Sequence, residues 1–135
     1  MRKVKVAIVG SRSFTPILGN ISKQHSRTRS LINAAMKNLY EDKPVLSKII
    51  SGGADGADKY GEAYAALEGV KTEILRPDWE THGNSAGYLR NAVIVEKADI
   101  IVAYWDGESK GTKHTIELAI RQRKPLAIIR IDERG

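Results

Sequence analysis

The sequence predicts a single Rossmann-like α/β domain, a doubly wound sheet of about five parallel strands with helices on both faces. Three observations predict it. Short β-branched segments alternate along the chain with longer segments of helical periodicity. Each connection is too long for a hairpin, which implies right-handed βαβ units. The runs 100–103 and 126–129 are apolar throughout, as in strands that are buried on both sides. The 135 residues are too few for two full domains, so we treat 1–135 as one.

The expected elements alternate strictly along the chain. Val4–Val9 is a β-branched run that stops at Gly10 and leads into a polar loop broken by Pro16. Apolar positions at helical spacing predict an amphipathic helix over Ser26–Tyr40. The following elements are strand Val45–Ile50, helix Asp55–Leu67, strand Val70–Leu75, a loop over 81–87, a helix capped by Asn84 or Ser85 that runs to Lys97, strand Asp99–Tyr104, a helix to Arg123 and strand Pro125–Ile131.

The composition limits the kinds of partner. Twenty-two Lys and Arg against sixteen Asp and Glu give a net charge of +6, which favours phosphate-bearing partners but does not choose between nucleic acid and a small nucleotide. Without cysteine the chain has no disulfide and no thiol-rich metal site. The start of the chain lacks the apolar region of a signal peptide, and no apolar run approaches the ~20 residues of a spanning helix. We expect a soluble, cytoplasmic protein with no membrane partner.

The residues that carry chemistry should lie at the carboxyl edge of the sheet, where open α/β sheets bind ligands. The unusual loops all follow strand ends: Gly10–Arg12, Ser51–Asp58, Pro77–Trp79 and Trp105–Thr112. Asp99 begins a strand instead, so we expect it to have a structural role at the opposite edge.

The stretch Ser51–Asp58 is typical of a strand, a tight glycine turn and the start of a helix. Its glycines permit positive φ and a close approach, so that backbone amides can converge on an anion at the positive end of the helix. This pattern predicts a phosphate-binding loop. The same letters also fit a purely structural turn, with Asp55 as N-cap and Asp58 at the third helical position.

Several other classes of site are disfavoured. The chain has neither the G-x-G-x-x-G pattern of dinucleotide binders nor the G-x-x-x-x-G-K-[ST] pattern of P-loop NTPases. His25, His82 and His114 lack the mutual spacing of metal ligands, so we expect no metal. Trp79 and Trp105 follow strand ends, where each indole could stack on a base or close a loop over the core.

Taken in order, these segments resemble the YspA-like branch of the SLOG superfamily, which groups Rossmann-like domains related to the DNA-processing protein DprA and to the LOG cytokinin-activating enzymes. The matching residues are those of the loops above, together with Ala86-Gly87, Arg90-Asn91 and Ala98-Asp99, and they lie between about Val4 and Ile129. The resemblance implies a pocket for a nucleotide or nucleotide derivative, formed by loops 51–58 and 107–112, and a role in sensing or processing such a ligand.

The resemblance also implies a set of ligand-binding residues. Phosphates are expected at Gly52, Gly53, Gly56, Gly111 and Thr112, with positive charge from Arg12, Lys110 and Arg90. Contacts to ribose or base are expected from Ser11, Ser51, Asp78 and Asn91, and the set is completed by Gly10, Asp55, Asp58, Trp79, Trp105 and Asp106. The structural alternative is that Arg90 and Asn91 only tie the third helix to neighbouring loops.

An enzymatic alternative follows from the LOG enzymes, which cleave the N-glycosidic bond of a nucleoside monophosphate with a Gly-Gly-x-Gly-Thr-x-x-Glu motif. In this chain the motif's glutamate position is Thr115, and the next carboxylate is Glu117. A slip of two residues moves a helical side chain about 3 Å along the axis and most of the way to the other side of the helix. An N-glycosidase or phosphoribohydrolase would therefore need Asp55, Asp78 or Asp106, of which we favour Asp106 as catalytic residue.

The third hypothesis is a nucleic-acid-binding module, which the excess of basic residues and the relation to DprA suggest. Such a module needs a contiguous basic surface. A homo-oligomer is also compatible with the sequence. The Arg27–Tyr40 helix could pair two copies, or it could pack only on its own sheet. Apart from a nucleotide-type ligand, no cofactor is expected.

Overall fold

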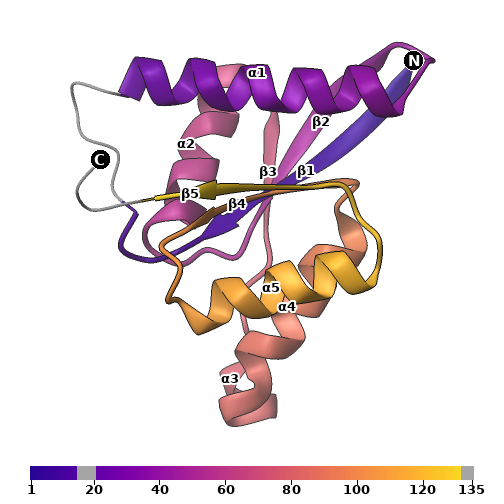
Figure 1. The fold of residues 1–135 in the computed structure, drawn as a ribbon. Helices are drawn as coiled ribbons and strands as arrows, with labels where there is room; N and C mark the ends of the chain where they lie inside the picture. Colours follow the sequence, from indigo (N-terminus) through magenta and orange to yellow (C-terminus); the bar gives the residue numbers. More distant parts are fainter. Residues whose placement is uncertain (15–20, 132–135) are drawn as a thin grey trace.

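The computed structural model describes residues 1–14 and 21–131, which form a five-stranded sheet between two layers of helices (Figure 1). The strand order is β3-β2-β1-β4-β5, and every pair of neighbours is parallel. The elements are β1 (Arg2–Gly10), α1 (Ile21–Leu39), β2 (Pro44–Ser51), α2 (Ala57–Glu68), β3 (Lys71–Ile74), α3 (Trp79–His82), the 3-10 helix η2 (Gly83–Ser85), α4 (Ala86–Lys97), β4 (Ile100–Trp105), α5 (Lys110–Arg121) and β5 (Leu126–Arg130). The predicted Rossmann-like α/β class is confirmed.

The central strand β1 contributes to the core on both of its faces. Val4, Val6 and Ile8 are buried on the side that α1 and α2 cover, whereas Ala7 and Val9 are buried on the side that α4 and α5 cover (Figure 1). Successive residues of a strand point to opposite faces, so a strand between two helical layers needs apolar residues at every position. This requirement explains the continuous apolar runs in the sequence.

The strand ends and most helix ends lie within two residues of their predicted positions, and the start of the first helix is the exception. The first helix begins at Ile21 rather than Ser26. The last ends at Arg121 rather than Arg123, whose φ of 57° is left-handed and stops the helix. Pro16, expected to break the loop after β1, lies outside the described residues.

The predicted loop over 81–87 is wrong, because this segment is largely helical. The Asp78 carboxylate accepts a hydrogen bond of 3.2 Å from the Thr81 amide and so caps the short helix α3. The 3-10 helix η2 then leads into α4. Ser85 occupies the N-cap position of α4, as predicted, although its side chain makes no cap hydrogen bond.

The apolar side of α1 packs on the sheet of its own chain, where Ile32 and Met36 are buried. Pairing of two copies through this helix stays a prediction. Among the described residues, none of the helices combines the length and the apolar character needed to cross a bilayer.

The position of the site follows from the strand order. Connections that leave β1 go to one face of the sheet and those that leave β4 go to the other, so a crevice opens between the carboxyl ends of these neighbouring strands (Figure 1). Asp99 lies at the opposite edge, where its carboxylate accepts a 2.8 Å hydrogen bond from the Lys5 amide. This contact confirms the structural role that its position at the start of a strand predicts.

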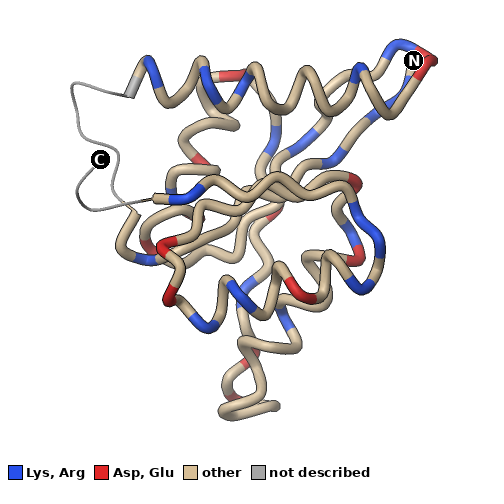
Figure 2. The backbone as a smooth tube through the Cα atoms, in the orientation of Figure 1, with Lys and Arg blue, Asp and Glu red and all other residues tan. Residues whose placement is uncertain are grey.

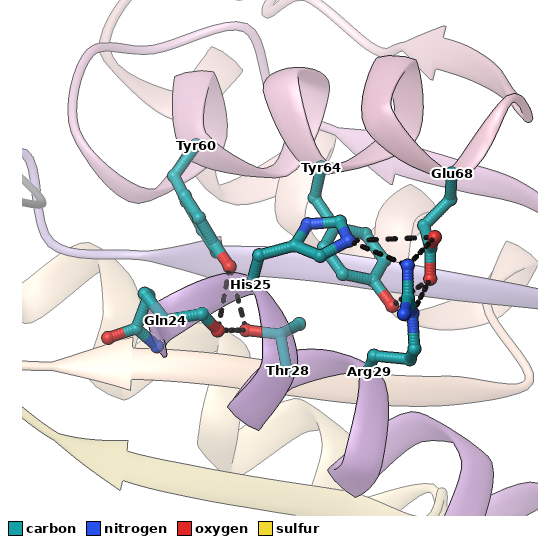
Figure 3. Close-up of polar contacts among 7 residues, drawn as sticks. All are labelled: Gln24, His25, Thr28, Arg29, Tyr60, Tyr64 and Glu68. Atoms are coloured by element: carbon teal, nitrogen blue, oxygen red, sulfur yellow. Dashed lines mark hydrogen bonds and ion pairs between the residues drawn. The ribbon is translucent and has the colours of Figure 1, made fainter. Parts of the chain in front are cut away.

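A polar cluster around Glu68 joins α1 to α2 (Figure 3). Arg29 donates a hydrogen bond of 2.8 Å to each carboxylate oxygen, and the Tyr64 hydroxyl donates another of 3.1 Å. The His25 ring lies 3.5 Å from the same carboxylate. The hydrogen bonds from Arg29 lower the pKa of Glu68 to about 2, and Tyr64 adds to the effect. The folded state therefore favours the ionised carboxylate.

We expect Glu68→Gln to destabilise the protein by about 1–2 kcal/mol at neutral pH, because it removes charge-assisted hydrogen bonds whose Arg29 partner is half exposed. A depressed carboxylate pKa gives stability that is present above the ordinary value of 4.5 and lost as the pH falls toward 2. In urea unfolding, the difference in free energy of unfolding between Glu68→Gln and wild type should therefore be smaller at pH 3 than at pH 7. Glu96→Gln, at an exposed position of α4, is the control. An equal difference at both pH values would contradict this account.

Candidate functional site

Two adjoining cavities open at the carboxyl edge of the sheet. The first, of about 380 Å³, is lined by Val9, Gly10, Arg12, Ser13, Ala54, Asp58, Arg90, Asn91, Ile94, Asp106, Ser109, Gly111, Thr112 and Thr115. The second, of about 570 Å³, is lined by Arg12, Gly52, Gly53, Ala54, Arg76, Pro77, Trp79, Asn84, Gly87, Tyr88, Arg90, Asn91 and Gly111. Because five of these residues line both cavities, the two form one continuous site.

The structure gathers most of the predicted site residues here. Those that line a cavity are Gly10, Arg12, Gly52, Gly53, Asp58, Trp79, Arg90, Asn91, Asp106, Gly111 and Thr112. Those that line neither are Ser11, Ser51, Asp55, Gly56, Asp78, Trp105 and Lys110. Several of this second group support the loops from behind, whereas Asp55 and Lys110 are exposed to solvent.

Two backbone amides of the glycine loop after β2 already donate hydrogen bonds to nearby side chains. The Gly53 amide donates to the Ser51 hydroxyl at 3.1 Å, and the Ala54 amide donates to the Asp58 carboxylate at 3.1 Å. The N-cap of α2 is Gly56, so the interpretation of Asp55 as N-cap is wrong. Asp58, in the first turn, therefore occupies a position that an anion would take at a helix N-terminus.

Asp58 is held in this cavity at an energetic cost. The residue is 6% exposed, and burial raises the pKa of its carboxyl from 3.8 to about 6, although the Ala54 amide and the Arg90 guanidinium oppose the shift. Titratable groups perturbed by burial next to a charged partner are concentrated in functional clefts. The sequence indicates Asp58 as a site residue but gives no sign of this perturbation.

We expect Asp58→Asn to stabilise the protein by about 1–3 kcal/mol at pH 8, because it removes a buried charge. A raised carboxyl pKa means that stability is lost as the pH rises from 3.8 through about 6, so the variant and wild type should be nearly equal at pH 4. Thermal unfolding across this range measures the difference. The control is Asp55→Asn, at the exposed position in the same loop. An Asp58→Asn protein that is less stable than wild type at pH 8 would overturn this assignment.

Arg90 ties α4 to the ends of two strands while it lines both cavities. Its guanidinium donates to the Gly52 carbonyl at 2.6 Å and to the Leu75 carbonyl at 3.5 Å. Burial lowers the pKa of Arg90; the nearby charge of Arg12 adds to the effect, and Asp58 opposes it. The structure thus shows the anchoring role weighed for Arg90, whereas its contact with a ligand stays a prediction for a side chain that lines both cavities.

Asn91 also lines both cavities and connects neighbouring elements. It accepts from Arg90 Nε at 3.0 Å, and its amide nitrogen lies 3.4 Å from the Gly111 carbonyl and 3.3 Å from His114 Nδ1. These contacts join α4 to the start of α5, beside the first cavity.

The start of α5 opens into the first cavity. Ser109 is the N-cap, and its hydroxyl accepts from the Thr112 amide at 3.5 Å. The Lys113 amide bonds the Ser109 carbonyl. Within the described part of the chain, the amides of Lys110 and Gly111 have no acceptor. The positive end of this 12-residue helix is therefore available to an anion.

Asp106 organises the loop between β4 and α5. Its carboxylate accepts from the Ser109 amide at 2.7 Å, from the Glu108 amide at 2.8 Å and from the Ser13 hydroxyl at 3.3 Å. The backbone hydrogen bonds lower its pKa. The carboxylate can accept a hydrogen bond from a ligand hydroxyl, but it is poorly suited to donate a proton.

Trp105 and Trp79 have different environments. The Trp105 indole donates to the Ser109 carbonyl at 3.1 Å and lies beneath the Arg130 guanidinium, so it closes the loop over the core. Trp79 is 56% exposed and lines the second cavity. Of the two roles that the sequence leaves open, Trp105 has the structural one.

Some lining residues were missed by sequence reasoning. In the first cavity these are Val9, Ser13, Ile94 and Thr115, and in the second they are Arg76, Asn84 and Tyr88. Ala54, Pro77 and Ser109 lie in the loops named from the sequence, and Gly87 lies in a segment that carries the family resemblance, but none of them was singled out as a ligand-binding residue. Arg76 follows the end of β3, so the rule that selected its neighbours could have found it. No sequence signal indicates which face of α4 carries Tyr88. Among the described residues, no three His, Asp or Glu side chains meet in a group able to hold a metal ion.

Comparisons with known proteins agree with the fold. Residues 4–82 match the family described as YspA, cpYpsA-related SLOG (YAcAr). The chain is 34% identical over 106 residues to the Gene 61 protein of Mycobacterium phage D29, and the match covers 74% of this chain and 85% of that protein.

Two solved structures of DNA processing protein A are similar over 96% of this chain. The Helicobacter pylori protein, whose structure is described for its single-stranded DNA binding mode, has a TM-score of 0.62 and 24% identity. The Streptococcus pneumoniae protein has a TM-score of 0.64 and 20% identity. The match covers 66% and 51% of those two chains, so this chain corresponds to a part of each, and at these identities the likeness concerns the fold alone. The match to more than half of the sequence, with the phage relative, shows that the chain belongs to the YspA, cpYpsA-related SLOG family.

Proposed function

We propose that the protein binds a small nucleotide or nucleotide-derived ligand across the two cavities, with its phosphate in the first. The observation that carries the proposal is the convergence of Arg12, Arg90 and the N-terminus of α5 on this one cavity. Guanidinium groups suit phosphate because their donors match two of its oxygens.

The charge balance of the cavity supports an anionic ligand. Burial lowers the pKa of Arg90 most; Asp58 opposes this shift, and the nearby charge of Arg12 adds to it. A doubly negative phosphate would stabilise both guanidinium charges and would also meet the first-turn amides of α5 that have no acceptor among the described residues. Asp58 and Asp106 supply acceptors that suit ribose hydroxyls.

Isothermal titration with nucleoside mono- and diphosphates and inorganic phosphate tests the proposal. Arg12 is exposed and lines both cavities, so Arg12→Ala should keep the fold and weaken nucleotide binding by about 10-fold or more. Arg121→Ala removes an exposed arginine from the opposite end of α5 and should leave binding unchanged. No heat of binding from any phosphate compound, or equal losses in the two variants, would refute the proposal.

Single-stranded DNA is a second candidate, because the similar Helicobacter pylori structure is described for that binding mode. The net charge of +6 is compatible with it. However, Lys and Arg positions are spread over both helical layers, and acidic positions occur in both layers as well (Figure 2). A DNA-binding function predicts that an oligonucleotide binds more tightly than a mononucleotide, with an affinity that falls steeply with salt.

Hydrolysis of the N-glycosidic bond is the enzymatic alternative, with Asp106 polarising water or a ribose hydroxyl. The hydrogen bonds that lower the pKa of Asp106 favour the role of acceptor over that of general acid. Release of free base from a nucleotide incubated with the protein, lost in Asp106→Asn, would support the enzyme. Recovery of the intact nucleotide would support binding alone.

A further inference from the structure

The second cavity differs in character from the first. It lies against α3 and the start of α4, and two large aromatic side chains line it, Trp79 at 56% and Tyr88 at 51% exposure. Large aromatic side chains exposed together in one concave site are typical of ligand-binding surfaces.

Local contacts fix the backbone that carries Trp79 and the ring of Tyr88. Trp79 begins α3, whose N-cap Asp78 is fixed by the Thr81 amide. The Tyr88 ring packs edge-on against His114 at a centroid distance of 4.6 Å. Gly87 also lines the cavity, and a Cβ at this position would lie 3.8 Å from the Trp79 indole, so the backbone of α4 runs close to that ring. We refer to the part of the second cavity that Trp79 and Tyr88 line as the aromatic slot.

We propose that this aromatic slot receives the base of the nucleotide, stacked on Trp79, while the phosphate lies in the first cavity. The inference rests on the proposed function and extends it to the base. The residues shared by the two cavities, among them Asn91 and Gly111, lie where the ribose would join the two ends of the ligand. The rest of the slot wall carries Arg76 and Asn84, which can reach the edge of a base.

The slot chemistry favours a purine, and guanine most. The larger ring system of a purine offers more stacking area to an indole than a pyrimidine does. Arg76 has only donors, and the guanine O6 and N7 atoms form the acceptor pair that arginine binds in a bidentate manner. We therefore assign GMP-like ligands to the site ahead of AMP and of CMP.

Binding of GMP, AMP, CMP and ribose 5-phosphate to wild type and Trp79→Ala tests this assignment. Loss of the indole should weaken GMP binding by about 10-fold or more and leave ribose 5-phosphate within about 2-fold, because stacking on an aromatic contributes about 1–3 kcal/mol per base. Arg76→Gln should reduce the ratio of the affinity for GMP to the affinity for AMP. Leu67→Ala, an exposed apolar residue of α2 outside both cavities, is the control and should change nothing.

The outcomes separate this inference from the proposed function. If wild type binds ribose 5-phosphate as tightly as GMP, or if Trp79→Ala weakens both equally, the aromatic slot does not hold the base and the phosphate site stands alone. If Arg12→Ala weakens binding but Trp79→Ala does not, the base lies elsewhere. If no phosphate compound binds wild type, the proposed function fails and the inference fails with it.

Discussion

Gly56→Ala should unfold the protein at a temperature about 15 °C below wild type, since it combines about 1–3 kcal/mol of backbone strain with about 1–3 kcal/mol of overpacking. Gly56 has φ of 79°, and a Cβ there would meet the backbone carbonyls of Ser11 and Arg12. The backbone cannot yield easily, because the Ser11 carbonyl accepts a 3.2 Å hydrogen bond from the Ala57 amide. The substitution would therefore separate the loop after β1 from the start of α2, and with it displace Arg12 from the first cavity.

Gly69→Ala is the matched control. Gly69 has a similar φ of 68° at the C-cap of α2, but a Cβ there would meet nothing within 4 Å. It should therefore show only the intrinsic penalty of a left-handed alanine, about 1–2 kcal/mol. Melting temperatures of the two variants therefore compare backbone strain alone, in Gly69→Ala, with strain plus a steric clash, in Gly56→Ala. If Gly56→Ala melts within a few degrees of Gly69→Ala, the contact between the two loops does not constrain the site.

Arg90→Ala should destabilise the protein by about 2–4 kcal/mol and abolish nucleotide binding, because it breaks buried hydrogen bonds and leaves a buried carboxylate without its opposing charge. The lost contacts are those to the Gly52 and Leu75 carbonyls, and the carboxylate is Asp58. Denaturant unfolding at pH 8 measures the stability change, and titration calorimetry measures the binding. An Arg90→Ala protein of wild-type stability would show that these contacts are not formed.

Combining Asp58→Asn with Arg90→Ala tests whether the charge of Asp58 causes part of the stability loss. If the unpaired charge of Asp58 accounts for part of the Arg90→Ala loss, the double variant should be more stable than Arg90→Ala alone at pH 8, with a coupling of about 1–2 kcal/mol. The rescue should shrink toward pH 4, where wild-type Asp58 is protonated. Additive effects at both pH values would mean that the two side chains do not interact. Binding should not be rescued, since the double variant still lacks one of the two cavity arginines.

Much of the fold was predictable from the sequence because it depends on local patterns. Strands buried on both faces need unbroken apolar runs, and 100–103 fits this rule because all four residues are buried. The run 126–129 forms the edge strand β5, where Ile128 is 47% exposed, so the prediction that it is buried on both faces is wrong. The helix α3 was missed because four residues carry no periodicity, and its only signal is the capping carboxylate of Asp78. Its position nevertheless decides where Trp79 lies.

The candidate site was predictable in outline, since strand ends of a parallel sheet meet at one edge. That rule placed Arg12, Asp58 and Asp106 at the edge where one cavity brings them together, whereas Arg90, on α4, was indicated by the family resemblance. It could not show that the Ala54 amide binds the carboxylate of Asp58, because this depends on the path of the folded loop. Nor could it separate the exposed Trp79 from Trp105, which is fixed beneath Arg130.

The most direct test of the central claim is a crystal structure of the protein with the nucleotide that binds most tightly in titration. The account predicts a phosphate within hydrogen-bond distance of the Arg12 and Arg90 guanidinium groups and of the first-turn amides of α5. A phosphate bound away from these groups, or a nucleotide on another face with both cavities empty, would contradict it.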